Sequence, residues 1–424
     1  MEFIAELQAR GLVQDIMPGA EDLFRKGMVS AYIGFDPTAE SLHVGSLLPI
    51  TLLMRLQRAG HKPYALVGGA TGMIGDPSGK SAERNLLDRD AIDRNCEGIR
   101  RQLSHFIDFG DTLTNAAVLV NNYDWFKNFS FLDFIRDAGK LITVNYMMAK
   151  DSVKKRLETG LSFTEFSYQL IQGYDFLHLN QEHGVQLQMG GADQWGNITT
   201  GTELIRKKTG GEAYAFTSPL ITKSDGSKFG KSEGGNIWLD ANLTSPYQFY
   251  QFWLRLNDAE AEKMSLIFSF RSLEELNAQI ARHREAPHER LLQRLLAEEM
   301  TTMVHSEADL QFAKNASEIL FSNTAVELLQ SLNERQLLEV MDGVPQVQAS
   351  LADLQEGADL IGFLADQKVF PSKGEARKTI QGGGVRINKE KVEGIDFKLE
   401  PQHLLNGKYV LIQKGKNYTL AVFS

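Results

Sequence analysis

The sequence predicts an α/β fold: a parallel sheet with helices at the N-terminal end, then a helical domain, then a small α+β domain. The extended stretch AYIGF (31–35) leads through a loop into an apolar-rich helix (47–59), which ends at Gly60 before a second extended stretch, YALVGG (64–69). Helical periodicity then dominates from residue 246 to about residue 322. Beyond it, short helical and β-like stretches alternate to the C-terminus.

A strand, a helix and a second strand in that order predict a Rossmann-like arrangement. A right-handed crossover makes 31–35 and 64–69 parallel neighbours in one sheet. Ligands of such sheets bind beyond the carboxyl ends of the strands, where residues 34–46 and 68–80 would meet. Further along the chain, VQLQM (185–189) alternates as a strand does, and the turn GGADQWGN leads into another helix.

The sequence pattern does not decide whether one helical stretch is buried or exposed. Residues 129–157 are rich in large apolar side chains, namely Phe131, Phe134, Ile135, Leu141, Ile142, Met147 and Met148. Such side chains form either ordinary core or a surface for a partner.

The patterns divide the chain into four parts. Residues 1–243 are predicted to form the Rossmann-like domain and 244–322 the helical domain. Residues 323–355 lack a clear period and are predicted to include a linker, and 356–424 form a small basic α+β domain.

Charge is distributed unevenly along the chain. The formal net charge is −9, which argues against a protein that simply coats nucleic acid. From residue 368 to the C-terminus there are 11 Lys and Arg against 5 Asp and Glu, a balance of +6 that leaves −15 for the rest. The basic end predicts either a contact with a polyanion or a solvated lysine-rich face.

Composition also narrows the class of protein. With 42% hydrophobic and 23% charged residues the chain is typical of globular proteins, and no apolar run approaches the ~18 residues of a membrane span. The lone Cys96 excludes a disulfide within the chain and a multi-cysteine metal site. We therefore expect a cytoplasmic protein without a membrane segment.

Two glycine-rich stretches invite comparison with phosphate-binding loops. GDPSGKS (75–81) and GSKFGKS (226–232) each have three residues between the first glycine and Gly-Lys, whereas a P-loop needs four. Neither stretch is therefore a Walker A motif. Both could still bring backbone amides and a lysine to a phosphate, although the second is also typical of an ordinary surface loop.

Five stretches taken together are far more specific than any one of them. They are YIGFDPTAESLHVGSL, LVGGATGMIGDPSGK, EFSYQLIQGYDF, LQMGGADQWGNI and DGSKFGKSEG. In this order and spacing the sequence resembles the bacterial tyrosyl-tRNA synthetases, a class I family, through essentially the whole chain. The resemblance implies a catalytic first domain, a helical domain on the anticodon side and a C-terminal RNA-binding domain.

The resemblance also implies the reaction and its participants. A homodimer would activate L-tyrosine with ATP, release pyrophosphate, and transfer the tyrosyl group to the 3′ end of tRNA(Tyr), with no editing. Mg²⁺ would accompany ATP without a dedicated protein metal site. The nucleophile of the first step is the substrate carboxylate, which is already ionised because its pKa is about 3.5. No catalytic base is needed, and the enzyme must instead supply donors and cations.

The class signatures map to HVGS (43–46) and KFGKS (228–232), so the implied catalytic residues are His43, Ser46, Lys228 and Lys231. Ser46 departs from the family, which usually has histidine there. We interpret this as a tuned site, because serine still donates a hydrogen bond. We also expect the Ser46 side chain to cap the helix that starts at Leu47.

Binding residues follow from the same resemblance. Those implied for tyrosine are Tyr32, Asp76, Tyr168, Gln172 and Asp175. Those implied for ATP or the adenylate are Gly34, Asp36, Thr38, Gly45, Gly190, Asp193, Gln194, Lys231 and Ser232. Those expected to contact tRNA phosphates are Arg206, Lys207, Lys208, Lys373, Arg377, Lys378 and Arg386, with Lys389 and Lys391.

Structural roles compete with several of these assignments. Asp76 could merely cap a turn, Tyr168 and Tyr174 could be core, and 206–208 could be a charged helix end. Three other functions also stay open: a synthetase for tryptophan, a nucleotidyltransferase with the same loop, and a silent RNA-binding protein on a synthetase scaffold. Tyr32 and Asp175 disfavour tryptophan, because an indole has no phenolic oxygen. Only Ser46 favours a silent scaffold.

Overall fold

The computed structural model describes residues 2–78, 87–150, 153–154, 160–222, 226, 229–232, 235–321, 326–354, 357–415 and 417–424. The chain divides into two compact units, Met1–Thr244 with Phe252–Val304, and Ser245–Gln251 with His305–Ser424. Within the described ranges, no helix has both the length and the apolar character needed to cross a membrane.

The first unit is built on a six-stranded sheet with the order β1-β6-β5-β2-β3-β4. Its strands are β1 (Asp15–Ile16), β2 (Ser30–Phe35), β3 (Lys62–Val67), β4 (Val118–Asn121), β5 (Leu187–Gly191) and β6 (Tyr214–Ser218). All are parallel except β1, which pairs antiparallel with β6. The predicted α/β fold with a parallel sheet is confirmed.

Strand order creates a crevice beside β2. The chain passes from β2 to β3 and β4 on one side, and later adds β5 and β6 on the other. The connections therefore diverge at the carboxyl ends of β2 and β5, where open parallel sheets bind ligands. The predicted helix is α3 (Leu47–Arg58), and Gly60 after it has a φ of 87°. Strands β4 and β6 were not predicted.

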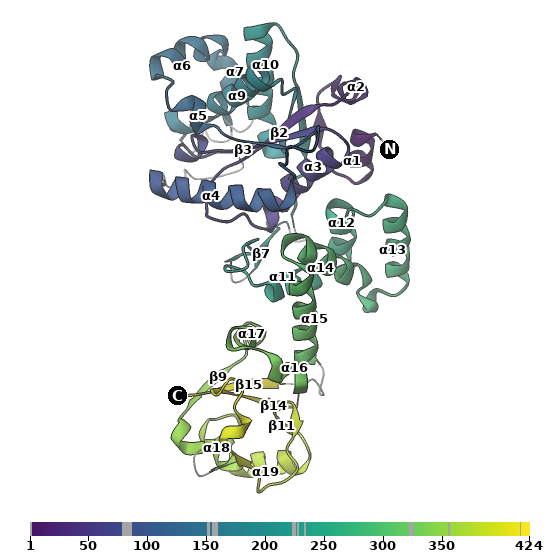
Figure 1. Cartoon of the computed structure of the whole chain (residues 1–424), viewed down its shortest axis with the longest axis vertical. Helices are drawn as coiled ribbons and strands as arrows, with labels where there is room; N and C mark the ends of the chain where they lie inside the picture. Colours follow the sequence, from purple (N-terminus) through teal and green to yellow (C-terminus); the bar gives the residue numbers. More distant parts are fainter. Residues whose placement is uncertain are drawn as a thin grey trace. The chain divides into compact units, whose positions relative to one another are not determined.

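Helices cover both faces of this sheet, with α4 (Arg89–Phe106) on one side and α9 (Phe163–His183) and α10 (Trp195–Thr209) on the other (Figure 1). Helices α9 and α10 pack closely because glycines face each other. A Cβ at Gly201 would lie 2.8 Å from the Cβ of Phe176, and one at Gly173 would lie 3.2 Å from the backbone nitrogen of Gly201. This packing sets the position of the polar side chains on α9.

The remaining helices of the first unit are shorter or follow the sheet in sequence. They are α1 (Phe3–Ala9), α2 (Ala20–Arg25), α5 (Tyr123–Phe126), α6 (Phe131–Asp137), α7 (Val144–Met148), α12 (Asp258–Phe268), α13 (Leu273–Glu285) and α14 (Leu291–Val304). Helix α11 (Pro246–Leu254) crosses the boundary between the units. The predicted helical character after residue 246 is confirmed.

The helical stretch predicted over 129–157 is broken into separate pieces. The side chain of Ser130 caps α6 and that of Thr143 caps α7, so each helix starts anew. Both predicted environments occur in this stretch. Ile142 and Met147 are buried, whereas Phe131 and Ile135 are exposed.

The second unit contains α15 (Glu307–Phe321) and a five-stranded sheet with the order β12-β11-β14-β15-β9. Its strands are β9 (Gln346–Ala349), β11 (Val385–Ile387), β12 (Glu390–Lys391), β14 (Tyr409–Lys414) and β15 (Asn417–Phe423). A separate pair joins β10 (Ala358–Asp359) to β13 (Lys398–Leu399), and α18 (Leu360–Asp366) and α19 (Lys373–Gln381) contribute to the core.

The described part of residues 323–355, the range expected to include a linker, contains regular elements. These are α16 (Val326–Ser331), α17 (Glu334–Val340) and β9, which adds to the sheet by pairing in parallel with β15. Strand β9 is a short edge strand of sequence QVQA, and only Ala349 in it is buried. A four-residue edge strand carries too little apolar periodicity to be recognised from sequence.

Candidate active site

A cavity of about 590 Å³ lies at the carboxyl ends of β2 and β5, within the first unit. Eleven of the residues predicted to bind tyrosine or ATP line it, together with the predicted catalytic residue His43: Tyr32, Gly34, Asp36, Gly45, Asp76, Tyr168, Gln172, Asp175, Gly190, Asp193 and Gln194. Thr38 and Ser46 are not among the lining residues, and Thr38 is exposed. The structure therefore brings together most of what the resemblance implied.

One part of the cavity carries two buried oxygen-bearing side chains, those of Tyr32 and Asp175. The Tyr32 side chain is 1% exposed, and no described group forms a hydrogen bond with its hydroxyl. The carboxylate of Asp175 accepts hydrogen bonds from Asn122 Nδ2 at 3.0 Å and Trp125 Nε1 at 2.9 Å. An unpaired buried hydroxyl costs free energy, so this part of the cavity suits a ligand with a polar atom of its own.

Burial also governs how these two groups ionise. It raises the pKa of Asp175 to about 8, although the donors Asn122 and Trp125 favour the ionised form, and the charge of Asp36 raises the pKa further. Burial, and then the nearby Asp175, raise the pKa of Tyr32 well above its usual value. The pair is thus held away from water in a low-dielectric part of the site.

A second polar group in the cavity is built around two carboxylates. Asp36 accepts from the hydroxyls of Tyr168 and Thr71, each at 2.9 Å. Asp76 accepts from Gln194 Nε2 at 2.8 Å with one oxygen and from the backbone N–H of Ser78 at 2.9 Å with the other. Asp76 therefore caps a turn and also lines the cavity. Two carboxylates among hydroxyl and amide groups can accept a cationic ammonium group.

His43 enters the cavity from the loop between β2 and α3. Its Nδ1 accepts from the backbone N–H of Gly45 at 3.0 Å, so the neutral ring carries its proton on Nε2 as a donor. The ring lies so close to Gly45 that a Cβ there would be 2.7 Å from His43 Cε1. Gly45 is therefore needed for the placement of His43.

The expected capping role of the Ser46 side chain is wrong. A 3-10 turn, Val44–Ser46, precedes α3, and Ser46 already has helical backbone angles, φ −82° and ψ −8°, with no capping hydrogen bond from its side chain. The residue with extended backbone angles is His43, whose ring accepts from Gly45 instead. The chain enters the helix one turn earlier than the sequence suggests.

The lysine loop is described only in part. Lys228 lies outside the described residues, as do the side chains of Lys231 and Ser232, whose backbone forms β7 (Lys231–Ser232) paired with β8 (Gly235–Asn236). Gly226 and Phe229 line the cavity. Trp238, just beyond β8, forms an antiparallel bridge with His43, so the His43 loop is joined through the backbone to the segment that follows the lysine loop.

The basic residues predicted to contact RNA differ in their environments. Arg206 and Lys207 pair with Glu203 at 2.7 Å and 3.2 Å, and Lys208 is exposed at the same end of α10. On α19, Lys373, Arg377 and Lys378 are exposed, and Lys391 on β12 is exposed as well. Arg386 on β11 is half-buried.

Lys389 is not the surface contact that was expected. Its side chain is buried at 1% exposure and donates to Tyr418 Oη at 2.6 Å. Burial, and then the charge of Arg386, lower the pKa of Lys389 to about 8. Lys389 is part of an unusual turn, in which both Asn388 and Lys389 have positive φ, 48° and 73°. With this backbone the side chain is buried against Tyr418 of β15 rather than exposed to solvent.

Several residues around the cavity were missed because their strands were missed. Asn122 and Trp125 follow β4 directly, and Ser218 ends β6. The apolar run VLV before Asn121 and Asn122 is the signal that could have revealed β4, since polar residues after a buried parallel strand face the ligand crevice. Gln188 of β5 also lines the cavity, with its Oε1 buried and unpaired among the described residues.

Two family models match this chain. Residues 25–322 match the class I tRNA synthetases (W and Y), and residues 336–421 match the tyrosine–tRNA ligase SYY-like C-terminal domain. The chain belongs to the class I tRNA synthetases of the W and Y group. The catalytic unit of this synthetase, with its cavity at the switch point of a parallel sheet, agrees with that membership.

Relatives of this synthetase are similar along its whole length. A tyrosine–tRNA ligase of Bacteroides thetaiotaomicron is 58% identical, and the alignment covers 100% of both chains. The crystal structure of a C-terminally truncated mitochondrial tyrosyl-tRNA synthetase of Aspergillus nidulans superposes with a TM-score of 0.67 and 29% identity, over 76% of this chain and 94% of that one.

A tryptophanyl-tRNA synthetase from Aeropyrum pernix K1 has a related fold, with a TM-score of 0.51 at 16% identity over 74% of this chain and 90% of its own. The fold alone therefore does not distinguish the amino acid.

The raised pKa of Asp175 predicts a pH-dependent stability. Because its folded pKa of about 8 exceeds the usual value of about 4, the protonated group favours the folded state, and this contribution is lost as pH rises toward 8. The free energy of unfolding of the wild type, minus that of Asp175→Asn, should fall by up to about 1.4 kcal/mol per pH unit between about pH 5 and pH 8.

Urea unfolding across this range measures the difference. Asp124→Asn replaces an exposed carboxylate on the neighbouring α5 and is the matched control, expected to follow the wild-type profile. A constant offset between wild type and Asp175→Asn at all pH values would contradict the prediction.

Proposed function

We propose that this synthetase is a tyrosine–tRNA ligase. The observation that supports it best is the buried, unpaired hydroxyl of Tyr32 in the same cavity as the carboxyl group of Asp175. A phenolic hydroxyl can pair with both groups at once, whereas an indole or an unsubstituted phenyl ring would leave the Tyr32 hydroxyl unpaired. The full-length relatives named tyrosine–tRNA ligase support the same substrate.

The first step joins tyrosine to ATP. An oxygen of the tyrosine carboxylate attacks the α-phosphorus, the bond to the bridging oxygen of the β-phosphate breaks, and tyrosyl-adenylate and pyrophosphate result. In the second step a hydroxyl of the terminal ribose of tRNA(Tyr) attacks the carbonyl carbon, and AMP leaves. Both steps depend on positioning and on stabilising charge rather than on a catalytic base.

Residues of the cavity divide between the two substrates. Tyr32 and Asp175 would bind the phenol, and Asp76, Tyr168 and Gln172 the ammonium group. The adenylate would contact Gly34, Asp36, Gly45, Gly190, Asp193 and Gln194, with Thr38 and Ser232 assigned by resemblance alone. His43 would donate to the phosphates in the transition state, and Lys228 and Lys231 would neutralise the departing pyrophosphate.

Magnesium would arrive with ATP, bound by the phosphate oxygens. In the described ranges no three His, Cys, Asp or Glu side chains gather as a metal site. Cytoplasmic localisation is a further proposal, supported by a single cysteine, Cys96, that is buried.

Transfer RNA would be held by the basic residues outside the cavity. The exposed Lys373, Arg377 and Lys378 lie within one helix, α19, and would contact phosphates together with Arg386. Arg206, Lys207 and Lys208 are proposed as a second contact, although Glu203 already pairs with two of them. We assign catalysis to residues 1–243, the anticodon side to 244–322 and RNA binding to 356–424.

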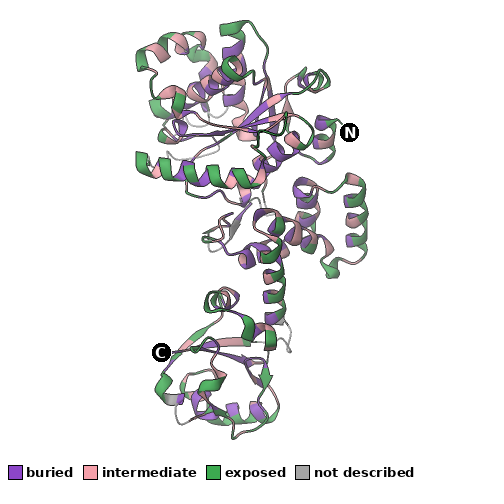
Figure 2. Cartoon of the chain, in the orientation of Figure 1, coloured by how far each residue is buried: buried purple, intermediate pink, exposed green. Residues whose placement is uncertain are grey.

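A homodimer is proposed from an exposed apolar surface on the first unit. The four most exposed large hydrophobic side chains of the described residues belong to α6, α7 and α9: Leu132 at 76%, Phe163 at 71%, Phe131 at 63% and Val144 at 62%. The green surface of α6 in Figure 2 is part of this region. Large apolar side chains as exposed as these are typical of an interface, and a twofold axis would pair the surface with itself.

Amino-acid-dependent exchange of pyrophosphate into ATP tests the proposed function. We expect exchange with tyrosine, none with tryptophan, and charging of tRNA(Tyr) by the same preparation. Exchange with tryptophan would assign the other specificity of the group. Absence of exchange with every amino acid, combined with RNA binding, would favour a silent scaffold.

His43 and Ser46, two positions of the first signature, are expected to differ in their effect on the reaction. His43 lines the cavity and Ser46 does not, so Ser46→Ala should slow adenylate formation by less than about tenfold, or ~1.4 kcal/mol. His43→Ala should cost ~2 to 4 kcal/mol, as expected for the loss of one donor to the transition state. Rapid-mixing measurement of adenylate formation compares the two variants, and equal losses would refute the ranking.

The proposed dimer surface predicts that one charged residue placed in it prevents dimer formation. Phe163→Asp places a carboxylate at the first residue of α9, which the helix tolerates, but buries it in the proposed interface. Analytical ultracentrifugation should find the variant monomeric at concentrations where the wild type is dimeric. Leu243→Asp changes another exposed hydrophobic residue outside this surface and should stay dimeric. A dimeric Phe163→Asp protein would place the interface elsewhere.

A further inference from the structure

One face of α4 lies against the loop that carries His43. Asn95, Gly98 and Gln102 are three and four residues apart, so they share one side of the helix. Asn95 Nδ2 donates to the carbonyl of Pro37 at 2.9 Å. A Cβ at Gly98 would lie 2.0 Å from the carbonyl oxygen of Glu40, so only glycine allows the loop to approach this closely.

The third residue of this face makes the contact nearest to His43. Gln102 Oε1 accepts from the backbone N–H of Leu42 at 2.7 Å, and its Nε2 donates to Ser41 Oγ at 2.8 Å. Ser41 and Leu42 are buried, and they immediately precede His43. One side-chain amide thus fixes the backbone on the N-terminal side of the histidine.

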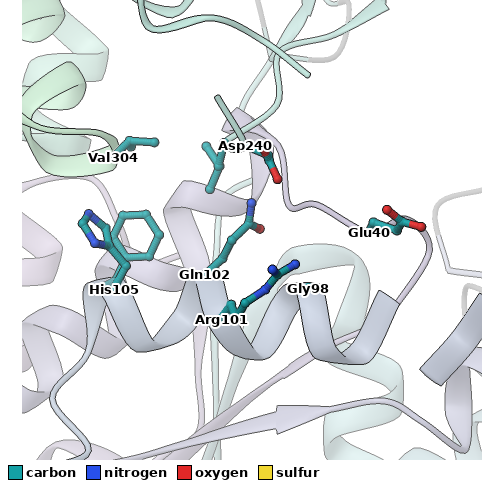
Figure 3. Close-up of a pocket in the computed structure, with 9 residues that line it drawn as sticks. Glu40, Gly98, Arg101, Gln102, His105, Asp240 and Val304 are labelled. Atoms are coloured by element: carbon teal, nitrogen blue, oxygen red, sulfur yellow. The ribbon is translucent and has the colours of Figure 1, made fainter. Parts of the chain in front are cut away.

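Ser41 extends this contact to the segment that follows the lysine loop. Its hydroxyl oxygen also accepts from the backbone N–H of Asp240 at 3.3 Å. The same segment pairs with the His43 loop through Leu239 N–H to Leu42 oxygen at 2.9 Å and Val44 N–H to Ile237 oxygen at 2.8 Å. Figure 3 shows Gln102 rising from α4 toward the segment that carries Asp240.

We propose that Gln102 is a positioning residue for tyrosine activation, which acts by holding Ser41 and Leu42 so that the His43 ring meets the phosphates. Gln102 is not among the residues that line the active-site cavity, so it acts through His43 and not on a substrate. The inference rests on the proposed function. A displacement of about 1 Å in a catalytic group can cost up to about a hundredfold in rate, so a small shift of the loop is sufficient.

Gln102→Met keeps the length of the side chain and removes both hydrogen bonds. A cavity of about 220 Å³ borders Gln102, lined also by Glu40, Arg101 and Asp240, so the methionine has room. The rate constant of adenylate formation at saturating substrates should fall between about tenfold and about a hundredfold. The dissociation constant of tyrosine should stay within about twofold, because its proposed contacts lie on other elements.

The decisive comparison repeats the substitution in a His43→Ala background. If Gln102 acts through His43, Gln102→Met should there slow adenylate formation by less than about twofold. An equal slowing in both backgrounds would overturn the proposal, and so would an unchanged rate in Gln102→Met alone. A parallel loss of tyrosine affinity would show a general structural defect and would also overturn it.

Two further variants complete the experiment. Gln57 on α3 is a matched control, because it is half-buried like Gln102 and its side-chain amide also both donates to and accepts from a loop. Its Nε2 donates to the backbone oxygen of Asp108 at 2.7 Å, and its Oε1 accepts from the backbone N–H of Asp108 at 3.0 Å. Gln57→Met should leave the rate of adenylate formation unchanged. Ser41→Ala removes a single oxygen from the contact and should slow the reaction in the same direction, which keeps the test available if Gln102→Met does not fold.

The wild-type protein separates this inference from the function on which it rests. Absence of tyrosine-dependent exchange in the wild type would refute the proposed function. A tyrosine-active wild type whose rate does not respond to Gln102→Met would refute the positioning role alone.

Discussion

The buried carboxyl group of Asp175 is the constraint on which the part of the cavity around Tyr32 depends. A carboxyl group removed from water is costly unless donors satisfy it, and here Asn122 and Trp125 do so from the segment that follows β4. Asp175 itself lies on α9, so α9 and the end of β4 must close on the same cavity. The close packing of α9 on α10 at Gly173 and Gly201 fixes the other side of α9, and Tyr168 and Gln172 are positioned with it.

The part of the cavity around His43 is held by a different kind of interaction. His43 and Trp238 belong to segments far apart in sequence that pair backbone to backbone, and Gln102 adds side-chain bonds to the same loop. Backbone pairing places the start of α3 and the segment beyond the lysine loop side by side regardless of most side chains. The part around Asp175 thus depends on the identity of a few buried polar residues, whereas the part around His43 depends on the path of the chain.

This difference explains what the sequence could and could not predict. The first strand, helix and second strand were recognised because 31–35 and 64–69 are short extended runs on either side of the apolar-rich helix 47–59. The cavity residues were found because the family motifs name them. Their supports were not found. Asn122 and Trp125 follow a strand of only four residues. Gln102 lies in a helix whose sequence pattern indicates which face is buried but not which loop that face contacts. The pairing of His43 with Trp238 joins distant segments, which periodicity within either segment cannot reveal.

Charge counting is subject to the same limit in the C-terminal unit. Eleven basic residues beyond residue 367 predict a surface that binds a polyanion. A count of charges, however, treats every one of these side chains as exposed to solvent. Lys389 instead lies 4.3 Å from the centre of the Tyr418 ring and donates to that hydroxyl. A buried ammonium with a lowered pKa offers less charge to a phosphate than an exposed one. The exposed side chains of α19 are therefore the stronger candidates for contact with RNA, whereas Lys389 packs against Tyr418 of the sheet.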